Sequence, residues 1–383
     1  MKVPLSRPSF GDAERAAIAR PLESGWVVQG PEVAAFEREL AAFVGAANAI
    51  ATTSCTTALQ LAAETLGLEP GDEVVVPAFT WIATASAIER AGGRAVFCDV
   101  SLETWNLDPS SLERAVGPRT VGIVPVHLFG RLAPMDAVLE LARARGLWVL
   151  EDAACALGAT RAGRHAGTFG DAGCWSFHPR KSITTGEGGM LTVTRAGAEE
   201  AARSLRDHGV GAAAATRGGL PDHPRIGCNF RMTDLQAALG RAQLARAEGL
   251  LTRRRSLASR YRQALADVPW LRLPDDAPAG ETHGWQAFVV RVEADRPRLD
   301  ALDALTRRRD ALMATLADAG VETRPGTHAP AFLSAYRDRG ATPASLPGAA
   351  LAQGLSLALP LYPDLGEDAQ AYVCERVRTF APV

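Results

Sequence analysis

The sequence has no long apolar run and no excess of either charge. No apolar run approaches the ~20 residues that a transmembrane helix needs, and the first residues show no signal-peptide pattern. The net charge is −2, with both signs interspersed along the chain. Such a balance argues against binding to nucleic acid or to an anionic membrane. We therefore expect a cytoplasmic protein that engages neither partner.

Closely spaced cysteines are also missing, because the six cysteines are scattered without a Cys-x-x-Cys pair. This spacing argues against a zinc site and against a disulfide framework, and it fits a reducing compartment. A G-x-G-x-x-G dinucleotide fingerprint in a strand–helix context is absent as well. We expect no metal ion, and nothing indicates a dinucleotide cofactor.

What is present is a regular alternation of short apolar runs and helical patterns. The 383 residues, 47% of them hydrophobic, suffice for a large domain and a smaller one. Alternating strands and helices are typical of a mostly parallel sheet covered on both faces. The expected strands are 49–51, 74–77, 95–100, 121–126, 147–150, 172–177 and 190–193, with helices at 11–23, 31–44, 58–66, 81–91, 109–115 and 135–144.

The C-terminal half predicts a smaller α/β lobe. A helix reaches about Arg206, residues 209–227 form a loop rich in glycine and alanine, and 232–266 show the longest helical pattern. The length of that pattern suggests one helix linking two lobes. Beyond it we expect strands at 287–292 and 355–358 and helices at 299–318 and 366–380. We place a large domain at 1–250 and a small domain at 251–383.

The stretch from Ser176 to Gly189 contains a lone lysine, Lys181, among hydroxyls and glycines between two expected strands. A lysine that is desolvated in such a loop can lose its proton and attack a carbonyl, forming a Schiff base. An ordinary surface loop is the alternative, and the loop alone favours that alternative. The rest of the chain decides between the two.

Ligands of parallel sheets bind at the carboxyl ends of strands, where further candidates stand. Asp152 can pair with a protonated ring nitrogen, and Trp81 can stack on a flat ring. The turn 54–57 opens a helix and, with Ser176, can bind a phosphate. Each residue alone could instead be a cap, a core aromatic or a turn residue. Together with Lys181 they match the needs of pyridoxal 5'-phosphate (PLP).

Three segments carry a resemblance to a known family: Glu-Asp-Ala-Ala-Cys around Asp152, Ser-Phe-His-x-x-Lys with Gly-Glu-Gly-Gly at 176–189, and Gly-Cys-Asn-Phe-Arg-Met-Thr-Asp at 227–234. With Pro-x-Phe-Thr-Trp-x-Ala-Thr at 77–84, they resemble the DegT–StrS family over the chain from about residue 5. That family contains PLP-dependent aminotransferases of nucleotide-sugar and aminocyclitol biosynthesis. The resemblance implies the type I aspartate aminotransferase fold, with a mostly parallel seven-stranded sheet in the large domain and a smaller C-terminal α/β domain.

The resemblance also implies roles for individual residues. Lys181 would hold the cofactor and then move the proton between substrate and cofactor. Asp152 would hold the ring nitrogen, and Trp81 would stack on the ring. The remaining residues that would contact the cofactor are Cys55, Thr56 and Ser176 at the phosphate, and Asn229 at the phosphate of a partner subunit. The implied assembly is a homodimer with shared sites, in which the 209–227 loop covers the neighbour's substrate.

Two positions depart from the family pattern. At the position of Cys155 the family commonly has Gln or His. The side chain of that Gln or His can hydrogen-bond the cofactor's phenolic oxygen. A thiol is a poor donor, so this contact is weakened or replaced. Cys228 stands where an aromatic is frequent and leaves room near the substrate. Lys181 argues against the branch of the family that has His at that position and works as a sugar dehydratase.

Substrate residues are less clearly indicated. Arg324 and His328 align with a segment beside the active site of relatives and could meet a phosphate or hydroxyls. A structural turn with a solvated arginine is an equally good interpretation. His178, in the lysine loop, is the third candidate.

The hypothesis is an aminotransferase that alternates between PLP and pyridoxamine phosphate (PMP). Glutamate or glutamine would supply the amino group, and a keto sugar would accept it, a nucleotide-linked 3- or 4-keto-deoxyhexose being the expected acceptor. A keto-cyclitol or another keto compound is the alternative acceptor. A PLP-binding regulatory protein without turnover is the alternative outside enzymes.

Overall fold

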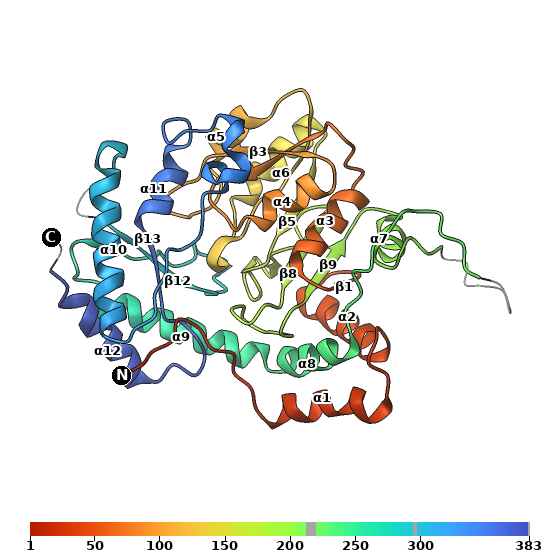
Figure 1. The fold of residues 1–383 in the computed structure, drawn as a ribbon, viewed down its shortest axis with the longest axis horizontal. Helices are drawn as coiled ribbons and strands as arrows, with labels where there is room; N and C mark the ends of the chain where they lie inside the picture. Colours follow the sequence, from red (N-terminus) through yellow and green to blue (C-terminus); the bar gives the residue numbers. More distant parts are fainter. Residues whose placement is uncertain (212–219, 294–296, 382–383) are drawn as a thin grey trace.

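The computed structural model describes residues 1–211, 220–293 and 297–381 (Figure 1). Its centre is a seven-stranded sheet in the order β1-β9-β8-β5-β4-β2-β3. Strand β9 runs antiparallel to both neighbours, and the remaining pairs are parallel. The α/β class and the mostly parallel seven-stranded sheet are therefore confirmed. The strands are β1 (Ile50–Thr52), β2 (Glu73–Pro77), β3 (Arg94–Cys98), β4 (Thr120–Ile123), β5 (Trp148–Asp152), β8 (Ala172–Ser176) and β9 (Gly189–Val193).

Helices cover both faces of this sheet because successive side chains of its buried strands point to opposite sides. Val149 packs in one apolar cluster, with α2, α5, α6 and α8, whereas Leu150 packs in another, with α3, α4 and α7. Val75 and Val76 divide between the two clusters in the same way. These helices are α2 (Pro31–Val44), α3 (Cys55–Thr65), α4 (Ala83–Arg90), α5 (Pro109–Ala115), α6 (Met135–Arg145), α7 (Ala198–Arg206) and α8 (Asp234–Ala245); α1 (Asp12–Ser24) packs on α8.

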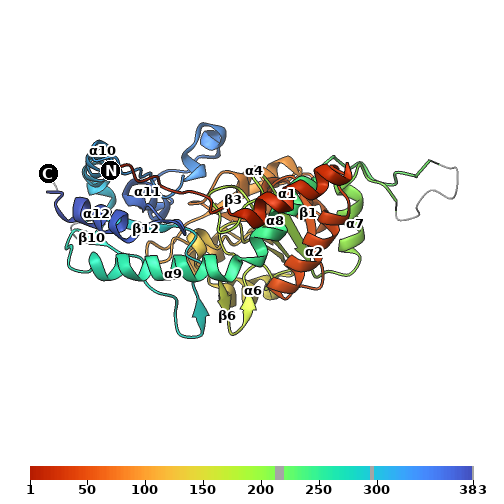
Figure 2. The same ribbon diagram turned by 90° about the horizontal axis from the view of Figure 1, so that it is seen from below.

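The C-terminal part has a separate apolar cluster around a three-stranded antiparallel sheet, β10-β12-β13. Side chains of α9 from Leu257 to Tyr261, together with Leu265 directly after the helix, belong to this cluster. The predicted boundary at residue 250 stays a prediction; it falls inside α9, which runs along the edge of the molecule in Figure 2. The elements are α9 (Ala247–Ala264), β10 (Leu271–Arg272), β12 (Phe288–Val292), α10 (Leu302–Asp318), α11 (Pro347–Leu355), β13 (Ser356–Leu359) and α12 (Glu367–Arg378).

The single linking helix predicted over 232–266 is wrong. The chain forms two helices, α8 and α9, that meet at Arg246, whose φ of −101° and ψ of 0° interrupt the regular geometry. Helical apolar spacing continues on both sides of Arg246, and neither proline nor glycine stands at the break. The periodic pattern therefore could not reveal it.

An arm leaves the body of the molecule after α7 (Figure 1). Its two legs pair through backbone hydrogen bonds, from the N–H of Gly211 to the oxygen of Asp222 and from the N–H of His208 to the oxygen of Cys228. Part of the predicted 209–227 loop, residues 212–219, lies outside the described residues. A small antiparallel sheet, β11-β6-β7, lies on another side of the body. Its strands are β6 (Thr160–Arg161), β7 (Arg164–His165) and β11 (Glu281–Thr282).

Candidate active site

Ser176 and the turn after β1 lie at the same end of the sheet, where β1 and β8 reach their carboxyl ends. Ser176 pairs with Gly189 of β9, and Gly189 also pairs with Thr52 of β1. A Cβ atom at Gly189 would lie 2.4 Å from the carbonyl carbon of Ser54, so only glycine allows this close approach of backbones. The sequence thus places Ser176 beside the turn that opens α3.

The turn at 54–57 has the geometry of an anion site. The Ser54 side chain caps α3 by accepting from the N–H of Thr57 at 3.2 Å. The N–H groups of Cys55 and Thr56 have no protein acceptor within the described ranges, and they stand at the positive end of the helix. Thr56 is exposed, whereas the Cys55 side chain packs in the core and burial raises the pKa of its thiol well above 9.0. Cys55 therefore offers an anion its backbone N–H.

Asp152 ends β5 and faces the helices on the α3–α4 side of the sheet. Its Oδ2 accepts from Thr84 Oγ1 at 2.8 Å, and its Oδ1 accepts from the N–H of Ala154 at 3.1 Å. Burial raises the pKa of this carboxyl, although these two hydrogen bonds and the charges of Lys181 and His127 act in the opposite direction. A cation brought against Asp152 would favour the ionised form.

Lys181 lies beside a thiol. Its Nζ atom is 3.1 Å from Cys155 Sγ, and its side chain is half-buried. Burial lowers the pKa of this amine, but the thiols of Cys155 and Cys55 and the carboxylate of Asp152 outweigh burial and raise the pKa above 10.5. Burial by itself acts in the direction that the sequence analysis described, and in the cofactor-free chain the acidic groups around the amine act more strongly.

Side chains from the C-terminal half hold the lysine loop. Arg254, which is buried in α9, donates to the Lys181 oxygen at 3.4 Å, and Gln286 donates to the Arg180 oxygen at 2.8 Å. Sequence reasoning missed both residues, since each is more than 70 positions from the loop and carries no local motif. They join the lysine loop to α9 and to the segment between β11 and β12.

Trp81 follows β2 and has an open face. Half of its surface (50%) is exposed, and its ring centroid lies 5.5 Å from that of His328. A backbone bond from the N–H of Thr80 to the His328 oxygen, 3.1 Å long, keeps these two segments together. The structure thus places His328 next to Trp81.

The other candidates are placed less specifically. Arg324 is half-buried and pairs through its backbone with Ala358 of β13. His178 is half-buried in the lysine loop, where burial lowers its pKa. Asn229 is exposed at the base of the arm and pairs with Asp207. No hydrogen bond joins any of these three side chains to Lys181 or Asp152 within the described residues.

A fully buried hydrogen-bond network supports the end of β5 from the opposite face. Glu151 accepts from His127 Nε2 at 2.8 Å, from the N–H of Gly167 at 2.8 Å and from the N–H of Gly170 at 2.6 Å. The ring of His127 accepts from the N–H of Ala133 at its Nδ1 atom, which fixes the proton on Nε2. His127 directly follows the expected strand 121–126, and Glu151 begins the Glu-Asp-Ala-Ala-Cys segment; the sequence alone does not show that the two residues pair.

These groups fit a PLP molecule by their chemistry. Two unpaired N–H groups at a helix start suit a phosphate, and a buried carboxylate suits a cationic ring nitrogen. The amine of Lys181 lies in a loop close enough to Cys55 and Asp152 for their charges to act on it, and an open indole face is available to a flat ring. Lys181, Asp152, Trp81, Thr56, Ser176 and the Cys55 backbone are the residues that would hold it.

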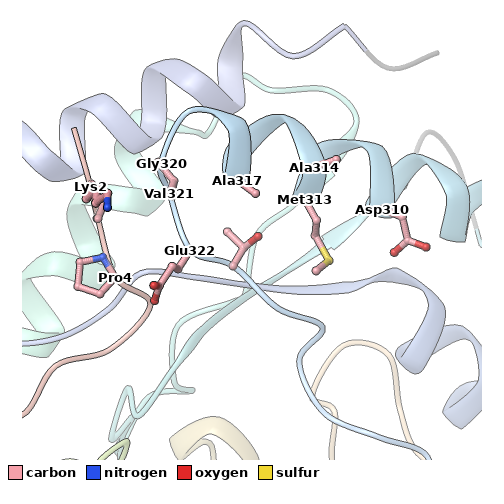
Figure 3. Close-up of a pocket in the computed structure, with 11 residues that line it drawn as sticks. Lys2, Pro4, Asp310, Met313, Ala314, Ala317, Gly320, Val321 and Glu322 are labelled. Carbon is pink, nitrogen blue, oxygen red and sulfur yellow. The ribbon is translucent and has the colours of Figure 1, made fainter.

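A separate open pocket of about 840 Å³ lies between the N-terminal segment and α10 (Figure 3). Met313, Ala314 and Ala317 of α10 form one side of it, and Lys2 and Pro4 form the other. Its carboxylate Glu322 already accepts from the N–H of Leu5 at 3.1 Å. None of the predicted site residues lines this pocket.

Comparison with known proteins agrees with this geometry. Residues 8–378 match the model of the DegT/DnrJ/EryC1/StrS aminotransferase family. The chain is 38% identical, over 98% of its length and 96% of the relative's, to the spore coat polysaccharide biosynthesis protein SpsC of Bacillus subtilis. The aminotransferase TlmJ of Streptoalloteichus hindustanus superposes with a TM-score of 0.90 and 36% identity, covering 99% of this chain and 98% of TlmJ. The putative sugar aminotransferase Spr1654 of Streptococcus pneumoniae, in its PMP-form, gives 0.91 and 28%, covering 99% and 97%.

Proposed function

Because the chain belongs to the DegT/DnrJ/EryC1/StrS aminotransferase family, we propose that it moves an amino group from glutamate or glutamine to a keto sugar. The predicted family, the enzyme class and the PLP cofactor are confirmed by that membership and by solved relatives in PLP- and PMP-forms. When bound, PLP supplies an aldehyde that exchanges amines and a ring that accepts electrons. The observation that carries the proposal is the grouping of Lys181, Asp152 and the α3 turn at one sheet edge.

In this proposal Lys181 is the catalytic residue. Its amine is the one that the cofactor aldehyde would meet, and the same amine would carry the proton that moves during amine exchange. Support comes from its loop position, its half-burial and its fixed place beside Cys155. Cys155 would take the place of the amide or imidazole that relatives commonly have at the cofactor's phenolic oxygen.

The binding residues divide by chemistry. Asp152 would hold the cationic ring nitrogen, because its two hydrogen-bond donors leave lone pairs free on each carboxylate oxygen. Thr56, Ser176 and the Cys55 N–H would bind the phosphate at the start of α3. Trp81 would stack on the ring with its exposed face.

We propose a nucleotide-linked 3- or 4-keto-deoxyhexose as the acceptor, in amino-sugar biosynthesis of the kind that includes antibiotic sugars. The relatives named for polysaccharide biosynthesis and sugar amination support the sugar class. Arg324, His328 and His178 are the proposed substrate residues. His328 is the best placed, since it is exposed beside Trp81.

We further propose a cytoplasmic homodimer with sites shared across the interface. Large apolar side chains are exposed on the segment after α1, where Trp26 is 54% and Val28 61% exposed, and on the arm, where Ile226 is fully exposed. Exposed apolar groups of this size mark contact surfaces. Asn229 at the base of the arm would then reach the partner's phosphate. In the described part of the chain, no helix combines the length and apolarity needed to span a membrane.

An isotope-transfer experiment tests the function. The protein with added PLP is given ¹⁵N-labelled glutamate or glutamine and a panel of nucleotide-linked keto-deoxyhexoses and keto-cyclitols. We expect a labelled amino sugar in the mass spectrum with the wild type and none with Lys181→Ala. Label found only in an aminocyclitol would replace the acceptor class, and label in no product with any acceptor would contradict the proposal.

A further inference from the structure

A chain of buried hydroxyls leads to Asp152. Thr84 Oγ1 donates to Asp152 Oδ2 at 2.8 Å, and the hydroxyls of Thr80 and Thr84 are 3.1 Å apart. Thr80 and Thr84 are each 1% exposed, and Asp152 is 5% exposed. Water therefore has little access to these hydroxyls, and the hydrogen bonds of the carboxylate come from the protein.

The direction of these bonds is fixed. The single hydroxyl hydrogen of Thr84 is used on Asp152, so the contact between the threonines must be donated by Thr80. Both bonds thus point toward the carboxylate, and bonds aligned in this way polarise one another. The arrangement follows from position, because Thr80 precedes α4 and Thr84 lies four residues later, in its first turn.

The local fold requires a donor at this place. Asp152 shares a sheet face with Leu150, which packs with α3 and α4, and burial on that face raises the pKa of the carboxyl. The hydrogen bond from Thr84 is the largest contribution in the opposite direction, ahead of the Ala154 N–H and the charges of Lys181 and His127. Removing only that bond would shift the balance toward the protonated acid.

We propose that Thr84 is a positioning residue that keeps Asp152 oriented and ionised for the ring nitrogen of the cofactor, with Thr80 reinforcing it. This inference rests on the proposed role of Asp152. Neither threonine was assigned a role from the sequence, although both stand in the Phe-Thr-Trp-x-Ala-Thr segment. The Thr80 backbone also bonds to the oxygen of His328, so the chain of hydroxyls begins beside the proposed substrate segment.

The test compares how tightly two cofactors bind to the cofactor-free protein. Tryptophan fluorescence reports the equilibrium binding of each. One is PMP, and the other is its analogue with a carbon in place of the ring nitrogen. The ratio of the two dissociation constants measures the contact between Asp152 and the ring nitrogen and does not require turnover. We expect the wild type to prefer PMP. In Thr84→Val the ratio of the two dissociation constants should fall about tenfold, which is the scale of one hydrogen bond to a charged group.

Matched variants separate positioning from packing. Valine is isosteric with threonine, and Thr84→Ser retains the hydroxyl, so this serine variant should recover most of the preference. Thr80→Val should lose a smaller part, because it removes only the second bond of the chain. Thr192→Val is the control, because Thr192 is also buried but takes no part in the chain of hydroxyls. Its hydroxyl donates to the Gly167 oxygen at 3.2 Å.

The outcomes are distinct. A loss of preference in Thr84→Val, with Thr84→Ser and Thr192→Val near the wild type, supports the inference. An unchanged ratio in Thr84→Val overturns it, even where both affinities fall together, since that pattern reports packing alone. A wild type that binds both cofactors equally would overturn the Asp152 role first and the inference with it.

Discussion

The amine of Lys181 and the thiol of Cys155 are 3.1 Å apart, although 26 residues separate them in the chain. The pair couples two proton-binding groups at the centre of the site. Cys155 is half-buried and sits in the segment that follows β5, so the strand that ends in Asp152 also positions the partner of the lysine. Substitutions in this segment should therefore change the pKa of Lys181 before they change the fold.

Cys155→Ala should lower the pKa of Lys181. The interaction with Cys155 is the main one that offsets burial, so burial should dominate when the sulfur is removed. The amine can be titrated in the cofactor-free protein after ¹³C-methylation of lysines, by NMR. Cys155→Ser, which keeps a polar atom, should fall between. An unchanged titration of Lys181 in the alanine variant would show that the thiol does not set the protonation of the amine.

Asp152→Asn should stabilise the cofactor-free protein at neutral pH. The pKa of Asp152 is raised, so the folded chain holds this proton more tightly than the unfolded chain does. Stability then falls as pH rises from the usual value of 3.8 through the raised pKa, and the asparagine variant lacks this loss.

Thermal unfolding of both proteins between acidic and neutral pH measures this difference. The gap between variant and wild type should widen with pH. Asp303→Asn, at an exposed position of α10, is the control. A gap that stays constant or reverses would contradict the raised pKa.

Glu151→Leu should cost about 1–3 kcal/mol of unfolding free energy for each donor left without an acceptor, because His127 and two glycine N–H groups stay buried. Glu151→Gln keeps one acceptor oxygen and should cost less. Urea unfolding of the cofactor-free protein measures both. Equal, small effects of the two substitutions would mean that the network contributes little to holding the end of β5.

Gly189→Ala should weaken cofactor binding about tenfold or more, equivalent to ~1.4 kcal/mol. The added methyl group would meet the Ser54–Cys55 backbone at 2.4–2.5 Å and push the α3 turn away from Ser176. Gly249→Ala is the matched control, since nothing lies within 4 Å of a Cβ atom there and it removes a glycine from a helix. Fluorescence titration with PMP should separate the two, and equal affinities would refute the close-approach argument.

The sequence predicts the large sheet well because its strands are short, apolar and separated by clear helical patterns. It predicts less well where the local signal is small. Strands β6, β7, β10 and β11 have two residues each, too few for any periodicity, and α11 reads as an apolar run before β13. The break at Arg246 has no proline or glycine to mark it.

The site divides in a similar way. Lys181, Asp152 and Trp81 lie at or just after strand ends, so position and residue type alone are enough to propose them. The contacts of Thr84, Glu151 and Arg254 could not, because each joins segments that only the folded sheet brings together. The protonation of Lys181 likewise depends on Cys155, Cys55 and Asp152, which only the folded chain brings to the amine.

An absorbance spectrum of the protein with PLP, recorded before and after addition of glutamate or glutamine, tests the central claim most directly. We predict a visible band that Lys181→Ala lacks, that is lost when the amino donor is added and that returns when the keto sugar follows. A visible band that neither donor changes, in a protein that binds PLP through Lys181, would contradict the assignment of this chain as a glutamate- or glutamine-dependent aminotransferase.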